Sequence, residues 1–280
     1  MGKIVIGVHG LGNKPAADIL YPQGWKKAML EGMSLNENSV TTDFDFNGVY
    51  WASVNYPEVD GDGETYRPAV PGELKSYDEG FVEDVVQAVE RAGGDILDWF
   101  KEKLNINNTA DLILEKKLGD LHKYYSDAEN YNHLTGLVMD EIAVHSDKTI
   151  LLIGHSMGSI IAYDALRRLG RESSNVMIDH FITIGSPLGL PHVVAKCREK
   201  HGSIRTPTIV KRWTNFADRR DPVATDEHLR DDYKPNSAGV RVEDNLVLND
   251  WRVESGVDIF HKSYGYLRTP EFSKVLAEFV

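Results

Sequence analysis

Several features that define large protein classes are absent from the 280-residue sequence. A single cysteine, Cys197, excludes an intrachain disulfide and predicts a packed thiol. No stretch approaches the roughly 18 uncharged apolar residues of a transmembrane helix, so no membrane span is expected. The N-terminal segment lacks the apolar core and cleavage site of a signal peptide, and Ile6 stands where myristoylation needs Ser or Thr. These absences favour a cytoplasmic protein.

Positive charge is also scarce, since 31 Lys and Arg face 43 Asp and Glu, for a formal net charge of −12. Nucleic-acid binding depends on clustered positive charge, so we expect no nucleic acid as a partner. The acidic excess is uneven. Residues 43–147 carry 23 acidic and 8 basic side chains, whereas the rest of the chain carries 20 acidic and 23 basic ones. The first half therefore predicts a strongly acidic surface.

Motifs for metals and dinucleotides are incomplete. The Asp- and Gly-rich run 60–64 lacks the spacing of an EF-hand and reads as a solvated acidic turn. Gly10 and Gly12 follow an apolar run, but Pro15 and Ala16 occupy the region where a dinucleotide-binding loop has its third glycine. We therefore expect neither a metal nor a cofactor.

Short β-branched runs alternate with segments of helical spacing, above all in the second half of the chain. Strands are predicted over 3–8, 44–54, 149–154, 177–184, 208–216 and 240–248. Helices are predicted over 23–33, 111–125, 134–145, 157–169, 190–200 and 270–280. Strands joined by such helices need right-handed crossovers, so we expect an α/β fold with a mainly parallel, twisted sheet and helices on both faces.

The block 57–132 differs from its surroundings. It begins with a loop over 58–72 that is rich in Asp, Gly and Pro, and continues with apolar residues three or four apart over 76–104. We predict a mostly helical, acidic insertion that forms a cap beside the site and sets substrate size. The alternative is that its acidic residues only keep the surface soluble.

The sharpest chemical signal is the Gly-x-Ser-x-Gly pattern formed by Gly154, His155, Ser156, Met157 and Gly158. A buried strand is predicted before it and an amphipathic helix after it, which is the context of a nucleophile elbow. Glycines are needed there because side chains on either side of the serine would collide with neighbouring elements. Ser156 is the predicted nucleophile, and the amide of Met157 is a predicted oxyanion donor.

A serine needs a base and an orienting acid, which follow it in this fold in the order acid, then histidine. Asp221 lies in a polar turn after a predicted strand, directly before Pro222, and is favoured over its competitor Asp218. His261 lies in a loop before the closing helix and is the predicted base. His228 follows the acid too soon and ranks below it.

The loop after the first strand normally supplies the second oxyanion donor. Here it contains His9, Gly10, Leu11 and Gly12, and we expect the Leu11 amide to be that donor. Gly10 lets the backbone approach the substrate. His9 is expected to hold the loop through a side-chain hydrogen bond.

Together these motifs resemble the lipase and esterase branch of the α/β-hydrolases. The resemblance rests on residues 8–12, 154–158, 221–223 and 261–264, and on the Gly-Ser-Pro stretch at 185–187. It implies one α/β-hydrolase domain over 1–280 with 57–132 as the insertion, and a start at residue 3 without the usual leading antiparallel hairpin, as in minimal lipases. It also implies an acyl-enzyme formed on the serine.

The expected activity is serine-dependent hydrolysis of a carboxylic ester on a small-molecule substrate. Thioesterase, acyltransferase and amidase chemistry remain open, because the same three residues activate acyl transfer generally. A binding or scaffold protein that keeps the fold without the chemistry is the alternative from another functional class.

Overall fold

The computed structural model describes residues 2–61, 63, 65–70, 72–78, 119–172, 176–221, 223–224, 226–251 and 260–280. Most of the helical spacing predicted over 76–104 and the first part of the helix predicted over 111–125 lie outside these ranges. The insertion predicted over 57–132 is therefore described only in its first and last parts.

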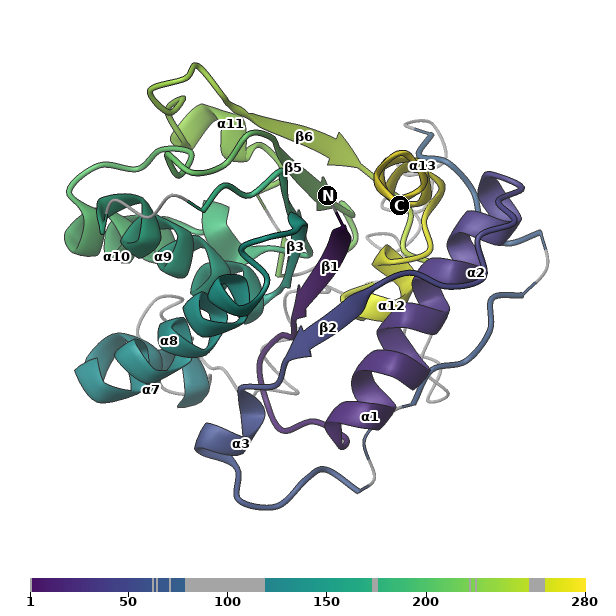
Figure 1. Ribbon diagram of the computed structural model, residues 1–280, viewed down its shortest axis with the longest axis horizontal. Coiled ribbons are helices and arrows are strands. Elements are labelled where there is room, and N and C mark those ends of the chain that lie inside the picture. Colours follow the sequence, from purple (N-terminus) through teal and green to yellow (C-terminus); the bar gives the residue numbers. More distant parts are fainter. Residues whose placement is uncertain are drawn as a thin grey trace, which may run out of the picture.

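A six-stranded sheet forms the centre of the molecule, with the strand order β2-β1-β3-β4-β5-β6 (Figure 1). All five neighbouring pairs are parallel, so the carboxyl ends of the strands lie at one edge. The strands are β1 (Lys3–Val8), β2 (Phe46–Val49), β3 (Thr149–His155), β4 (His180–Ile184), β5 (Trp213–Ala217) and β6 (Val242–Leu246). This arrangement confirms the predicted α/β fold with a mainly parallel sheet.

Helices cover both faces of the sheet, which is why the central strands are almost continuously apolar. In β1, Ile4, Ile6 and Val8 belong to one core cluster and Val5 belongs to the other, as expected for side chains that alternate between faces. A separate apolar core therefore packs against each face of the sheet.

The two helical layers come from different parts of the chain (Figure 1). One layer comprises α7 (Gly119–Ser126), α8 (Ala128–Val144), α9 (Met157–Arg171) and α10 (Pro191–His201). The other comprises α1 (Ala17–Leu20), the π-helical turn η1 (Tyr21–Lys26), α2 (Lys27–Asn36), α12 (Ser263–Tyr266) and α13 (Pro270–Phe279). Shorter elements are α3 (Ala52–Asn55), the 3-10 turn η2 (Pro187–Gly189) and α11 (Leu229–Asp232).

Several boundaries differ from the sequence prediction. The chain is already helical at Ala17, and α8 begins at Ala128 because Asp127 caps it by accepting hydrogen bonds from two first-turn amides. The strands predicted from 177 and 208 begin later, and these segments meet in an isolated bridge between Ile178 and Val210. The strand predicted over 44–54 ends at Val49, and α3 occupies the end of that range.

Two sequence expectations concern single features. Cys197 is a free thiol buried on α10, and burial raises the pKa of that thiol. Within the described ranges, no helix has the length and apolarity needed to cross a bilayer.

Candidate active site

Ser156 lies at the carboxyl edge of the sheet, in the sharp turn between β3 and α9 (Figure 1). Its backbone has φ 52° and ψ −128°, and among the described non-glycine residues only Asn38 shares a positive φ. Such a conformation costs about 1–3 kcal/mol and persists only where the surroundings enforce it. The turn therefore holds the serine in the strained geometry of a nucleophile elbow.

The two glycines of the motif are required by close backbone approach. A Cβ on Gly154 would lie 2.6 Å from the Cα of Ser159, and a Cβ on Gly158 would lie 2.3 Å from the carbonyl oxygens of Val8 and His9. All of these atoms belong to the backbone, so they cannot move aside as the end of a flexible side chain would. The crowding inferred from the motif is present on both sides of the serine.

His261 joins the serine to a carboxylate. Its Nε2 lies 2.9 Å from the Oγ of Ser156, and its Nδ1 lies 2.8 Å from the Oδ2 of Asp221. The carboxylate is fully buried, whereas the imidazole is 20% exposed. Three residues separated by up to 105 positions thus form a continuous chain of hydrogen-bonded groups.

Asp218, the competing acid, faces elsewhere. Its carboxylate accepts hydrogen bonds from the Arg220 guanidinium and from the amide of Asn249, and burial raises its pKa. The side chain of Asn249 in turn donates to the carbonyls of Phe260 and Lys262, on either side of His261. Asp218 therefore supports the loop that carries His261 indirectly, through Asn249, and does not contact the imidazole.

His155 also holds that loop. Its Nε2 lies 2.7 Å from the carbonyl oxygen of His261, so the ring donates from Nε2. Burial, with a further contribution from His261, lowers the pKa of His155 well below its ordinary value and keeps the ring neutral. His228, the lower-ranked base, lies at the start of α11 beside Glu227.

The loop after β1 lies directly against the elbow. A Cβ on Gly10 would come within 2.8 Å of the Cβ of Ser156. The Nδ1 of His9 donates to the Gly10 carbonyl at 2.8 Å, while its Nε2 accepts from the amide of Ala52 at 3.2 Å, so this imidazole is neutral. Burial lowers its pKa well below the ordinary value, in agreement with that assignment.

Two amides remain available for an oxyanion. In the part of the chain that the structure describes, the amides of Leu11 and Met157 have no protein acceptor. Met157 is the first residue of α9, where amides lack intrahelical partners and the helix dipole favours negative charge. The amide of Gly12 is bound to Asp120, which leaves Leu11 as the available donor of the two.

Sequence reasoning missed four side chains that support the site. Tyr266 donates from its hydroxyl to the Oδ2 of Asp221 at 2.7 Å, and Ser159 donates to the carbonyl of Ser156 at 2.5 Å. Asp120 and Lys14 bind the backbone of the loop after β1. Ser159 directly follows the recognised motif, but no local pattern marks the tyrosine, the aspartate or the lysine.

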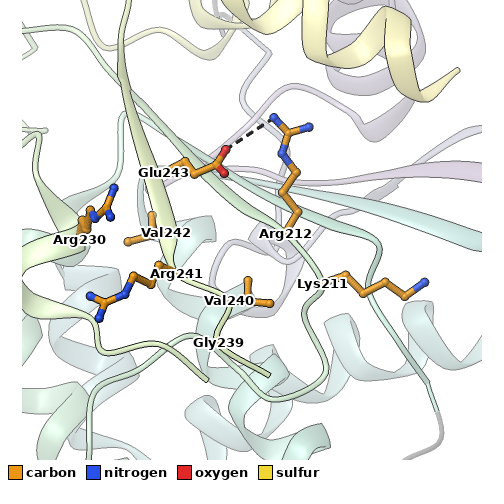
Figure 2. A pocket seen from close by; sticks show the side chains of 8 residues that line it. All are labelled: Lys211, Arg212, Arg230, Gly239, Val240, Arg241, Val242 and Glu243. Carbon is orange, nitrogen blue, oxygen red and sulfur yellow. Dashed lines mark ion pairs between the residues drawn. The ribbon is translucent and has the colours of Figure 1, made fainter. Parts of the chain in front are cut away.

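Other parts of the described chain offer no comparable centre. No group of three His, Cys, Asp or Glu side chains in those ranges has the arrangement of a metal site. A surface pocket of about 310 Å³ lies at the amino ends of β5 and β6, at the edge of the sheet opposite Ser156 (Figure 2). Half of its lining residues are basic, namely Lys211, Arg212, Arg230 and Arg241, and Glu243 is paired with Arg212.

The family model that matches this chain covers the segment around the elbow. Residues 120–197 match the family model of lecithin:cholesterol acyltransferase. A protein of Saccharomyces cerevisiae described as a probable mitochondrial phospholipase is 27% identical over 88 residues, which are 31% of this chain and 11% of that protein. The matched segment thus spans only about a tenth of the yeast protein.

Solved structures with some likeness to this chain include two proteins of biosynthetic pathways. The RedJ thioesterase of the prodiginine pathway in Streptomyces coelicolor is 14% identical, with a TM-score of 0.34 over 100% of this chain and 90% of its own. ClbQ, from the colibactin pathway, is 11% identical, with a TM-score of 0.36 over 99% of this chain and 100% of its own.

Proposed function

Because the chain is a member of the α/β-hydrolase superfamily, in its lipase- and esterase-like branch, we propose that it hydrolyses carboxylic esters through an acyl-serine intermediate. The observation that carries the proposal is the position of His261, within 2.9 Å of the strained Ser156 and 2.8 Å of Asp221. Hydroxyl groups are weak nucleophiles near neutral pH, and such a base activates them.

In the first half of the reaction, the Oγ of Ser156 attacks the ester carbonyl while the Nε2 of His261 accepts its proton. Asp221 accepts a hydrogen bond from Nδ1, which fixes the tautomer that leaves Nε2 free and stabilises the imidazolium. Tyr266 and the amide of Val223 donate to the same carboxylate and hold it in place.

Negative charge on the attacked carbonyl oxygen is stabilised by the amides of Leu11 and Met157. The imidazolium then gives its proton to the departing alcohol, and the acyl group remains on the serine. Water then attacks the acyl carbon while His261 accepts its proton. The bond from the acyl carbon to the Oγ of Ser156 breaks, the imidazolium returns its proton to that oxygen, and the carboxylic acid leaves. No residue changes its net protonation over the cycle.

The substitution Ser156→Ala tests the proposal. Hydrolysis of p-nitrophenyl esters, from acetyl to palmitoyl, is expected to fall on the order of 10⁴-fold or more. Labelling by a fluorophosphonate is expected to disappear from Ser156→Ala and to persist in Ser273→Ala, which removes a buried hydroxyl on α13. Equal rates in wild type and Ser156→Ala would overturn the proposal.

Acyl transfer to an alcohol is the second candidate, favoured by the match of residues 120–197 to an acyltransferase family model. Both reactions share the acyl-serine and differ in whether water or an alcohol takes the acyl group. Adding glycerol or a long-chain alcohol to the ester assay and measuring the new ester against free acid distinguishes the two.

The same proposal assigns substrate size to the insertion 57–132, as a cap beside the serine. Its support is that Asp120, near the end of the insertion, binds the loop that follows β1 and itself accepts hydrogen bonds from Asn55 and Tyr56, just before the insertion. The preferred acyl length in the ester series measures this assignment. Neutral, modestly apolar small-molecule esters are the proposed substrates, because the insertion is acidic.

A further inference from the structure

The peptide group between Leu11 and Gly12 is bound at both ends. Its N–H donates to the Oδ2 of Asp120 at 2.8 Å, and its carbonyl oxygen accepts from the ammonium of Lys14. In a trans peptide the N–H and C=O groups point in opposite directions, so two partners on opposite sides fix the plane of the group. The two partners carry opposite charges, which strengthens both hydrogen bonds.

The preceding peptide group, between Gly10 and Leu11, is fixed as well. Its carbonyl accepts from the Nδ1 of His9, so the Leu11 N–H must point away from that imidazole. The planes on both sides of the Leu11 Cα are therefore held. The Leu11 N–H lies in the first of these planes. The second plane shares the Leu11 Cα with it, so holding the second plane limits how far the Leu11 residue, and with it the N–H, can shift.

Asp120 is built to accept only. Its Oδ2 accepts from Gly12 and from the Tyr56 hydroxyl at 3.0 Å, and its Oδ1 accepts from the amide of Asn55 at 2.9 Å. The residue is 5% exposed and lies 108 positions from Gly12. The Oδ1 of Asn55 in turn accepts from Lys123 and Asn130, which fixes the orientation of that amide.

Lys14 complements this carboxylate. Its Nζ lies 3.1 Å from the carbonyl oxygen of Gly12 and 3.3 Å from that of Asn13, in addition to the contact with Leu11. Three carbonyls of the loop thus converge on one ammonium. Without the ammonium, the three carbonyl oxygens, each partially negative, would repel one another.

We propose that Asp120 and Lys14 are positioning residues that clamp the Leu11–Gly12 peptide and thereby aim the Leu11 amide at the oxyanion. This inference rests on the proposed function and adds to it a contribution from the insertion. Neither side chain touches the reacting atoms. Both act through the backbone of the loop, so their loss should weaken stabilisation of the transition state with little effect on substrate binding.

The test uses Asp120→Ala, Lys14→Met and the double variant, with Tyr56→Phe as the matched control. Tyr56→Phe removes a hydrogen bond to Asp120 but leaves the Gly12 contact intact. Removing an oxyanion donor costs about 10²–10³ in kcat, so misaiming one should lower kcat about 10–100-fold, with KM within about threefold. The double variant should lose no more than the worse single variant, because both residues hold one peptide.

The pH profile gives a signature that general destabilisation would not produce. Burial and the nearby Lys262 lower the pKa of Lys14 to about 8, while Asp120 and Asp60 raise it. Wild-type kcat should therefore fall as pH rises through about 8. Asp120→Ala should move this limb to lower pH, and Lys14→Met should abolish it, with His9 and His155 already neutral throughout this range.

Amide hydrogen exchange supplies a readout without activity. Exchange over residues 8–14 should become faster in Asp120→Ala and Lys14→Met and stay near wild type in Tyr56→Phe. Unchanged exchange in both clamp variants, or additive losses of kcat that follow the melting temperature, would overturn the clamp. A wild-type protein without Ser156-dependent hydrolysis would instead overturn the proposed function, and the exchange result would still decide the clamp.

Discussion

The elbow at residues 154–158 and the loop at residues 9–14 lie side by side at one edge of the sheet but are held in different ways. The elbow is shaped by its own backbone, between a buried strand and a buried helix, with glycines where neighbouring atoms come within 2.6 Å or less of a Cβ. The loop has no regular structure of its own. It is held by its own His9 and Lys14 side chains and by groups from distant segments.

The two regions therefore depend on different interactions, the elbow on steric contacts and the loop on hydrogen bonds. Ser156, the proposed nucleophile, is held in place by steric contacts that any substitution at the glycines would disturb. The loop after β1 accepts hydrogen bonds from the Trp51 indole and the Ala52 backbone amide and donates one to the Asp120 carboxylate. The bonds to the side chains of Trp51 and Asp120 can each be removed by a single substitution. A single substitution at the elbow should therefore disrupt the whole turn, whereas each hydrogen bond removed from the loop should cause a separate, partial loss of function.

Gly158→Ala should have the largest effect, because it breaks the contact between the two regions. The added methyl would meet the carbonyl oxygens of Val8 and His9 at 2.3 Å, and we expect a loss of about 3 kcal/mol or more in unfolding free energy. Gly136→Ala is the control, since this helical glycine has no atom within 4 Å of its Cβ and should gain about 0.5–1 kcal/mol. Similar melting temperatures for the two variants would contradict the steric account.

Trp51→Phe should weaken only the loop. The indole Nε1 donates to the His9 carbonyl at 2.8 Å and the ring stacks on the His9 imidazole. Its loss should cost about 1–3 kcal/mol in unfolding free energy. Trp213→Phe, which loses a buried hydrogen bond to Thr183, should cost a similar amount. Because a small displacement near reacting groups lowers rates strongly, only Trp51→Phe should reduce kcat, by about tenfold. Equal kcat values for the two variants would refute the assignment.

His180→Gln should have the smallest effect, since His180 begins β4 at the opposite edge of the sheet. Burial, helped by Arg212, lowers its pKa to about 3 from 6.5. Between these values the unfolded chain binds a proton that the folded chain does not, so stability falls as pH drops below about 6.5. The variant should lessen that slope by up to about 1.4 kcal/mol per pH unit in urea unfolding and keep its kcat near pH 7. Parallel stability profiles would count against this account.

Much of the fold was predictable because it rests on local patterns. Buried strands and amphipathic helices have distinct periods, so the parallel sheet and the order of its elements followed from apolar spacing. Boundaries were less predictable. The β-branched segment before Trp213 makes only an isolated bridge at Val210, because pairing depends on the partner strand as well as on propensity.

The candidate site divides in the same way. Ser156, Asp221 and His261 were identified from a motif and from chain order, and the structure brings their side chains together. Pro222 favoured Asp221 over Asp218 in the sequence, and the structure pairs Asp218 with Arg220 and Asn249 instead of the histidine. A local pattern could rank these two carboxylates but could not show which one contacts His261, because both follow one strand.

The sequence by itself determined the sheet, the elbow and the order of the three side chains proposed to be catalytic, because periodicity and backbone crowding act over a few residues. The tertiary structure decided which acid faces the histidine and what holds the loop after β1. Asp120 reaches Gly12 across 108 positions, and Tyr266 reaches Asp221 across 45. Such contacts form only when the layers pack, since a hydrogen bond between distant residues depends on the positions of both backbones and leaves no local mark on either segment.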